Sequence, residues 1–192
     1  MIYRFMFVGY TENIPSVKLT ADERYYVALS YKDNKVFMYV EANEEEVNPD
    51  LLADGELIAF PDGRKWERAY DIFHSSKPVS EEQWKRKAEN KVPRVRVNRL
   101  KPEKVASYIF YHYQYQEEMP GREKNKYGII FLYGDELIYY QELPREDETE
   151  VLEGALDTNH SPVDRWSELM KEHFADMWRP IENLAFSNYI VF

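Results

Sequence analysis

The feature that most limits the fold of this chain is an order of segments that occurs in both halves. In the first half, two β-prone runs, 25–31 and 36–41, flank a short polar turn and predict a β-hairpin. An acidic stretch follows at 44–46. The next segment, 64–73, has apolar residues at helical spacing and predicts a helix that carries Trp66 near its start.

The second half shows the same order of segments. The runs 127–133 and 137–141 predict a hairpin, and an acidic stretch follows at 146–148. The segment 163–174 then has the spacing of a helix and carries Trp166 near its start. We interpret this repetition as a degenerate internal duplication.

Further predicted elements of the second half complete a recognisable order of strands and helices. Residues 94–98 alternate like a strand, Pro102 predicts a helix over 101–118, and 188–192 is predicted as a closing strand. With the hairpin and the second helix, the order is β-α-β-β-α-β, which is typical of a ferredoxin-like unit. In the first half, 2–10 is predicted as a strand, but no apolar helical stripe follows it, so the corresponding helix is missing or reduced.

The predicted fold class is therefore α+β, with two ferredoxin-like units in tandem and the first unit degenerate. The first unit spans 1–78, a linker helix spans 79–92, and the second unit spans 93–192. The linker carries a small basic patch, which we expect to be part of a solvated connector: Lys85, Arg86, Lys87 and Lys91.

Composition excludes several classes of function. The formal net charge of the 192 residues is −10, whereas binding to nucleic acid or to an anionic membrane surface requires a basic surface. The chain has 0 Cys, which removes disulfides, thiolate metal sites and a cysteine nucleophile. No segment approaches the ~20 apolar residues of a membrane span. No signal peptide is recognised, so we expect a cytoplasmic protein.

Two polar residues on the helix predicted over 101–118 are the candidate site. Tyr108 and His112 are four residues apart and share a face with Val105 and Ile109. A phenol and an imidazole one turn apart are able to place an acid and a base on two sides of a small substrate. The same spacing also fits amphipathic core residues whose polar ends find partners.

No metal or cofactor is predicted. A group of His and Asp residues in the second half matches no ligand template: Asp157, His160, Asp164 and His173. The few glycines form no loop that could hold a phosphate group.

Several features of the second half occur together in one enzyme family. They are a helix that begins with Pro and carries a Tyr and a His four residues apart, a central hairpin, and an Arg-Trp pair followed by Met. In this chain they correspond to Pro102, Tyr108 with His112, residues 126–143, Arg165 with Trp166, and Met170. In these features residues 93–192 resemble the L-rhamnose mutarotase family, small ferredoxin-like α+β barrel enzymes that interconvert the anomers of a sugar.

The resemblance implies a function and a site. Tyr108 and His112 would carry the proton transfers that open and close the sugar ring, and Trp166 and Arg165 would contact the sugar. The reaction needs no cofactor or metal. The two units would pack as an intrachain α+β barrel, so that the chain is a monomer resembling a dimer, or a homodimer.

Two departures from the family pattern leave alternatives open. The family has a second Trp where this chain has Ser167, and the first half carries no Tyr/His helix. The alternatives are a non-catalytic module that binds a small ligand or regulates, and a cofactor-free monooxygenase-like barrel enzyme, because this architecture hosts many functions. A mutarotase requires that Tyr108 and His112 both line a pocket between helix and sheet.

Overall fold

The structure is a computed structural model, and it describes residues 1–20, 23–118, 124–147 and 165–187. It is rich in strands and contains few helices. The strands are β1 Tyr3–Tyr10, β2 Lys18–Leu19, β3 Tyr26–Lys32, β4 Lys35–Ala42, β5 Ala53–Asp54, β6 Glu67–His74, β7 Val92–Arg99, β8 Ile129–Tyr133, β9 Glu136–Leu143, β10 Arg179–Pro180 and β11 Glu182–Phe186. The α-helices are α1 Glu81–Trp84, α2 Val105–Glu118 and α3 Trp166–Lys171, and the 3-10 turns are Ile14–Ser16, Pro49–Leu51 and Pro102–Lys104.

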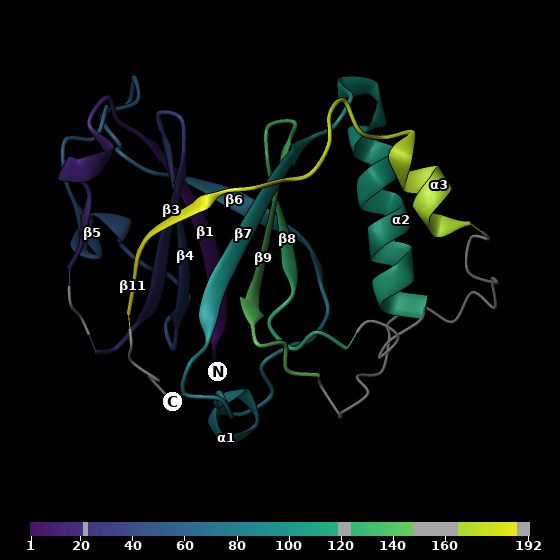
Figure 1. Ribbon diagram of the computed structural model, residues 1–192, viewed down its shortest axis with the longest axis horizontal. Coiled ribbons are helices and arrows are strands. Elements are labelled where there is room, and N and C mark those ends of the chain that lie inside the picture. The colour runs from purple at the N-terminus through teal and green to yellow at the C-terminus, as the bar shows by residue number, and fades with distance from the viewer. Residues whose placement is uncertain (21–22, 119–123, 148–164, 188–192) are drawn as a thin grey trace.

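One antiparallel sheet contains nine strands in the order β10-β7-β9-β8-β6-β1-β4-β3-β11. β10 and β11 are successive parts of one segment, so the two ends of this sheet meet. The backbone N–H of Ile181 donates to the Val95 carbonyl of β7 over 3.0 Å, and β11 pairs with β3. The result is a nearly closed barrel, in which the last segment crosses from the helical side toward β3 (Figure 1).

The strand order is the same in both halves. Within the first half the order is β6-β1-β4-β3, and within the second it is β10-β7-β9-β8. When the strands of each half are numbered along the chain, with β2 and β5 set aside in their own small sheet and β11 taken with β10 as one segment, both orders read 4-1-3-2. The halves join through the pairing of β6 with β8 and of β3 with β11.

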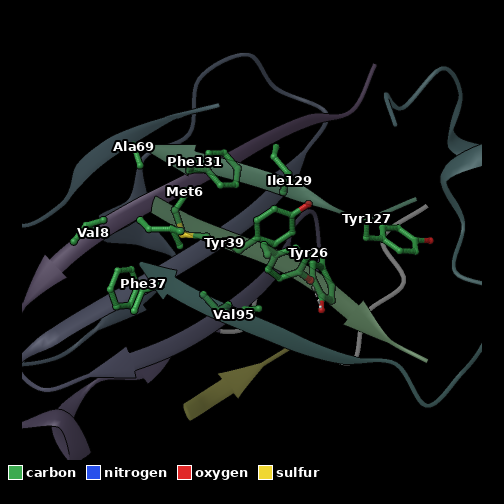
Figure 2. Close-up of a cluster of buried hydrophobic side chains, with 14 of the residues drawn as sticks. Met6, Val8, Tyr26, Phe37, Tyr39, Ala69, Val95, Tyr127, Ile129 and Phe131 are labelled. Atoms are coloured by element: carbon green, nitrogen blue, oxygen red, sulfur yellow. Dashed lines mark hydrogen bonds between the residues drawn. The ribbon is translucent and has the colours of Figure 1, made fainter. Parts of the chain in front are cut away.

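Aromatic and aliphatic side chains fill the barrel. Because successive residues of a strand point to opposite faces, one residue in two faces inward. Figure 2 shows Met6 and Val8 of β1, Tyr39 of β4, Val95 of β7 and Phe131 of β8 converging on one another in this interior. The interior is therefore a packed core.

The two halves cover the outer face of the barrel differently. In the first half, a second cluster packs under the loops that carry β2 and β5, with Val17, Leu52 and Trp66 among its buried residues. In the second half, α2 and α3 lie side by side on the outer face (Figure 1). Among the described residues, no α-helix lies between β1 and β3, which agrees with the predicted reduction of the first unit.

A charged cluster closes one end of the barrel. Arg86 follows α1, and its guanidinium donates to Glu142 over 2.6 Å and to Glu41 over 3.1 Å. Tyr39 donates to Glu41 over 2.7 Å and Tyr140 donates to Glu142 over 2.8 Å. The two phenol rings stack with centroids 3.6 Å apart. β4 and β9 are each the third strand of their half, so the two halves contribute matching Tyr-x-Glu triplets.

The prediction that the basic patch is a solvated connector holds for Lys85 and Lys87, which are exposed, but was wrong for Arg86 and Lys91. The Arg86 side chain is 5% exposed and the Lys91 side chain is 3% exposed, and Lys91 pairs with Glu146 over 3.2 Å. Within 79–92 the α-helix covers only Glu81–Trp84, and Ser80 caps it by accepting from the Gln83 N–H. Trp84 is fully buried in the barrel interior, so this segment seals the end of the barrel.

The prediction of a helix over 64–73 was also wrong, because this segment contains β6. The pairing of β6 with β8 shifts register between Asp71 and Phe73, which is a β-bulge. An extra residue in a strand interrupts the alternation of apolar residues. The interrupted pattern placed Trp66, Ala69 and Phe73 at intervals that resemble those of a helix.

Other elements follow the predictions. Both hairpins, the first strand, the strand before α2 and the helix over 101–118 are present. Of the helix predicted over 163–174, the structure has α3 Trp166–Lys171, and residues 163–164 lie outside the described part. The strand predicted over 188–192 also lies outside it, and the described chain contributes β10 and β11 at that edge instead.

Candidate functional site

Helix α2 positions the predicted pair. The preceding Pro102–Lys104 turn leads into the helix, as expected for Pro at a helix start. α2 packs against β6, and its inward face carries Tyr108, 1% exposed, and His112, 6% exposed. Residues four apart in a helix lie one above the other, and the two rings have centroids 4.0 Å apart.

A backbone contact sets the tautomer of His112. Its Nδ1 lies 3.0 Å from the carbonyl oxygen of Tyr108. A carbonyl oxygen only accepts, so Nδ1 carries the proton and Nε2 presents a lone pair. Burial lowers the pKa of His112 to about 4, against the opposing effect of the bond to the Tyr108 carbonyl. At neutral pH the imidazole is therefore neutral, with Nε2 as an acceptor or base.

The phenol of Tyr108 is a proton donor that complements the proton acceptor of His112. Burial raises its pKa above the ordinary value of 10.0, so the hydroxyl keeps its proton at neutral pH. In the described part of the chain, no side chain or backbone group hydrogen-bonds to this hydroxyl. The helix thus presents a neutral proton donor beside a neutral proton acceptor.

A pocket of about 800 Å³ lies on the outer face of the second half and contains both groups. Ile130, Tyr139 and Arg96 form a row across its floor, because they are register partners on β8, β9 and β7. Trp166 and Met170 of α3 and Trp178 after it also line the pocket, and Trp178 lies against Tyr139 with ring centroids 6.3 Å apart. The volume lies within the range of ~300–1,000 Å³ that is usual for small-molecule sites.

The other predicted site residues are divided between the pocket and the surface. Trp166 lines the pocket, and its ring lies edge-on to His112 with centroids 5.0 Å apart. Ser167 lines the pocket as well. Arg165 does not line it. Its side chain is 79% exposed and forms an ion pair with Glu168 over 3.3 Å.

Arg96, Tyr139 and Trp178 are among the pocket residues that the sequence did not single out. The guanidinium of Arg96 lies 4.8 Å from the ring centroid of Tyr139 and 5.6 Å from that of Trp178. The only available signal was the alternation of β7, in which Val95 and Val97 face the barrel and place Arg96 on the opposite face.

Neither a metal centre nor a membrane-spanning helix is found within the described ranges. No group of three or more His, Cys, Asp or Glu side chains in residues 1–20, 23–118, 124–147 and 165–187 could hold a metal ion. Of the four residues that the sequence analysis considered, Asp157, His160 and Asp164 lie outside these ranges. His173 is buried and bonded to the Leu169 carbonyl and the Ser107 hydroxyl. None of the described helices has the length and apolar character to cross a membrane.

Comparison with models of protein families, with curated proteins and with solved structures finds no match to this chain.

Proposed function

We propose that this protein is a sugar mutarotase that interconverts the anomers of L-rhamnose or a similar aldose. The observation that carries the proposal is the pairing of Tyr108 and His112 in one pocket, with a protonated phenol beside an imidazole whose Nε2 has no hydrogen-bond partner among the described residues. Mutarotation requires these two roles together, and it requires neither a metal nor a redox group.

The proposed chemistry assigns one role to each residue. His112 Nε2 accepts the proton of the anomeric hydroxyl while the Tyr108 hydroxyl donates its proton to the ring oxygen. The bond between the anomeric carbon and the ring oxygen breaks, and the anomeric carbon becomes an aldehyde. Rotation of the aldehyde and the reverse proton transfers close the ring on the other face. The histidine and the tyrosine then return to their starting forms, so no net proton is consumed.

Aromatic side chains suit a sugar as the ligand. Trp166 and Trp178 line the pocket, and the C–H faces of a pyranose pack favourably on aromatic rings. The pocket volume of about 800 Å³ leaves space for a monosaccharide.

We also infer that the fold is a tandem duplication of a ferredoxin-like unit. The shared 4-1-3-2 strand order and the matching Tyr-x-Glu triplets of β4 and β9 support this inference. The first unit lacks an α-helix between β1 and β3 in its described residues, so a Tyr/His helix is available only in the second unit. On this interpretation the molecule has one active site.

Anomer exchange measured by NMR saturation transfer on L-rhamnose and a panel of aldoses tests the proposal. We expect exchange above the spontaneous rate for at least one sugar, and a loss of about 100-fold or more in His112→Ala, because one general acid or base contributes about 10²–10⁴-fold. Tyr113→Phe is the matched control, since it removes a hydroxyl from the exposed face of the same helix. If anomer exchange is accelerated for no aldose, the proposal fails. A non-catalytic module that binds a small ligand is then the better explanation.

A further inference from the structure

Arg96 lies at the edge of the pocket, and no carboxylate of the described residues forms an ion pair with it. Its buried Nε has no hydrogen-bond partner in the described chain. An arginine side chain stays protonated in proteins, and burying part of an uncompensated charge is unfavourable. The rings of Tyr139 and Trp178 offset part of this cost through cation–π contacts.

The remaining charges of the pocket do not neutralise Arg96. Lys171 and Asp176 are the other charged side chains that line it, so the pocket has two cations and one carboxylate. Asp176 is already engaged, since its Oδ1 accepts the backbone N–H of Arg99 over 3.0 Å. The pocket thus carries a charge of +1 (two cations less one carboxylate) in a chain whose net charge is −10. This local charge favours an anionic ligand.

The guanidinium lies opposite the catalytic pair across the floor of the pocket. His112 packs edge-on against Phe73, which begins the cross-strand row that continues through Ile130 and Tyr139 to Arg96. The row from Phe73 to Arg96 crosses three strand spacings of about 4.8 Å each, and the guanidinium lies 4.8 Å from the ring centroid of Tyr139. A ligand in the pocket therefore meets one hydrogen-bonding group at each end of this row.

We propose that the substrate is an acidic aldose of the hexuronate class, and that Arg96 binds its carboxylate. This inference rests on the proposed mutarotase function. The planar guanidinium fork matches a carboxylate with two parallel hydrogen bonds, and the surrounding rings hold it in one orientation. A hexuronate carries its carboxylate on the carbon next to the ring oxygen, so binding at Arg96 directs the ring oxygen and the anomeric hydroxyl toward Tyr108 and His112.

The test compares each hexuronate with its neutral parent. Anomer exchange is measured by NMR for D-galacturonate beside D-galactose and for D-glucuronate beside D-glucose, with D-glucose 6-phosphate as the alternative anion. We expect kcat/KM to be about 10- to 100-fold higher for the hexuronate than for its parent, as for one charge-assisted bidentate contact. Arg96→Gln should abolish this preference.

Arg94→Gln is the matched control. Arg94 lies on the same face of β7, two residues away, is exposed and does not line the pocket, so this variant should keep the preference. Arg96→Lys is the second variant, because it keeps the charge and the apolar stem while it removes the fork. It should fold like the wild type and retain only part of the preference.

The outcomes separate the two proposals. Equal or faster exchange of the neutral sugars, or a preference that Arg96→Gln retains, overturns the acidic substrate and leaves the mutarotase intact. A stronger preference for the sugar phosphate overturns the carboxylate assignment. If no sugar is accelerated, tryptophan fluorescence titration with D-glucuronate and D-glucose decides. If D-glucuronate binds and D-glucose does not, and Arg96→Gln loses this binding, the carboxylate site is supported although the mutarotase proposal fails. If both sugars bind, or neither binds, the carboxylate site is overturned.

Discussion

Replacement of Arg86 by Met should strongly destabilise the fold. The side chains of Arg86, Glu41 and Glu142 are 5%, 0% and 0% exposed, and the guanidinium is the cation that hydrogen-bonds both carboxylates. Methionine has a similar length and fills much of the same volume, but it leaves two carboxylates buried at the end of the barrel without the guanidinium that hydrogen-bonds both. The nearby Arg4 acts on Glu41 through Tyr39 and does not replace these bonds.

The expected loss follows from the burial of this cluster. Removing one partner of a buried ion pair costs about 3–5 kcal/mol, because the remaining charge stays desolvated. Two carboxylates share Arg86, so we expect the upper part of this range. A domain of this size loses about 2–4 °C of Tm per kcal/mol, and the variant should therefore melt at least about 10 °C below the wild type.

Urea unfolding followed by circular dichroism measures this loss. Arg94→Met is the control, because exposed substitutions usually change the free energy of unfolding by less than about 0.5 kcal/mol. Adding Glu41→Gln and Glu142→Gln to the Arg86→Met variant removes both stranded charges and should recover at least half of the loss. A loss below about 1 kcal/mol in Arg86→Met, or no recovery in the triple variant, would refute the reasoning.

Three further predictions concern packing and pH. Gly9→Ala should cost about 1–3 kcal/mol in urea unfolding, because the added Cβ would lie 2.9 Å from Trp66 Cε3; a neutral effect would show that the indole moves freely. Trp84→Ala should cost about 3–5 kcal/mol in the same assay, since it empties the end of the core, and a loss under 1 kcal/mol would contradict the packing. The pKa of His112 is lowered to about 4 from 6.5, so unfolded chains bind the proton first as the pH falls. Wild type should therefore lose about 3 kcal/mol relative to His112→Gln between pH 6.5 and 4, and a constant difference would refute the shift.

Local sequence patterns were sufficient to predict the elements whose residues follow a regular spacing. The hairpins alternate regularly, and α2 has its apolar residues at helical spacing, so both could be predicted. β6 could not, because its bulge interrupts the alternation. The buried state of Arg86 could not be predicted either. Its partners Glu41 and Glu142 are 45 and 56 residues away in sequence, and only the closed barrel brings them together.

The candidate site likewise contains residues that local sequence spacing predicts and residues that it does not predict. Tyr108 and His112 are neighbours through helix geometry alone, so their spacing predicted their contact. Arg165 precedes Trp166 but points elsewhere, because it is the N-cap residue of α3 with a left-handed backbone (φ 60°) and its side chain pairs with Glu168. Arg96 reaches the pocket through strand register with Tyr139, which depends on long-range pairing that no local pattern shows.

We propose that Tyr108 and His112 act together on the anomeric centre of a sugar. The most direct test is a double-mutant cycle of the anomer exchange rate with Tyr108→Phe, His112→Gln and the combined variant, for the aldose that the wild type accelerates best. Each single variant should lose about 100-fold or more in exchange rate while keeping the wild-type circular dichroism spectrum. The combined variant should be little slower than the slower single variant, as for residues that act as a unit. Wild-type exchange at the spontaneous rate, or single variants as fast as the wild type, would contradict this proposal.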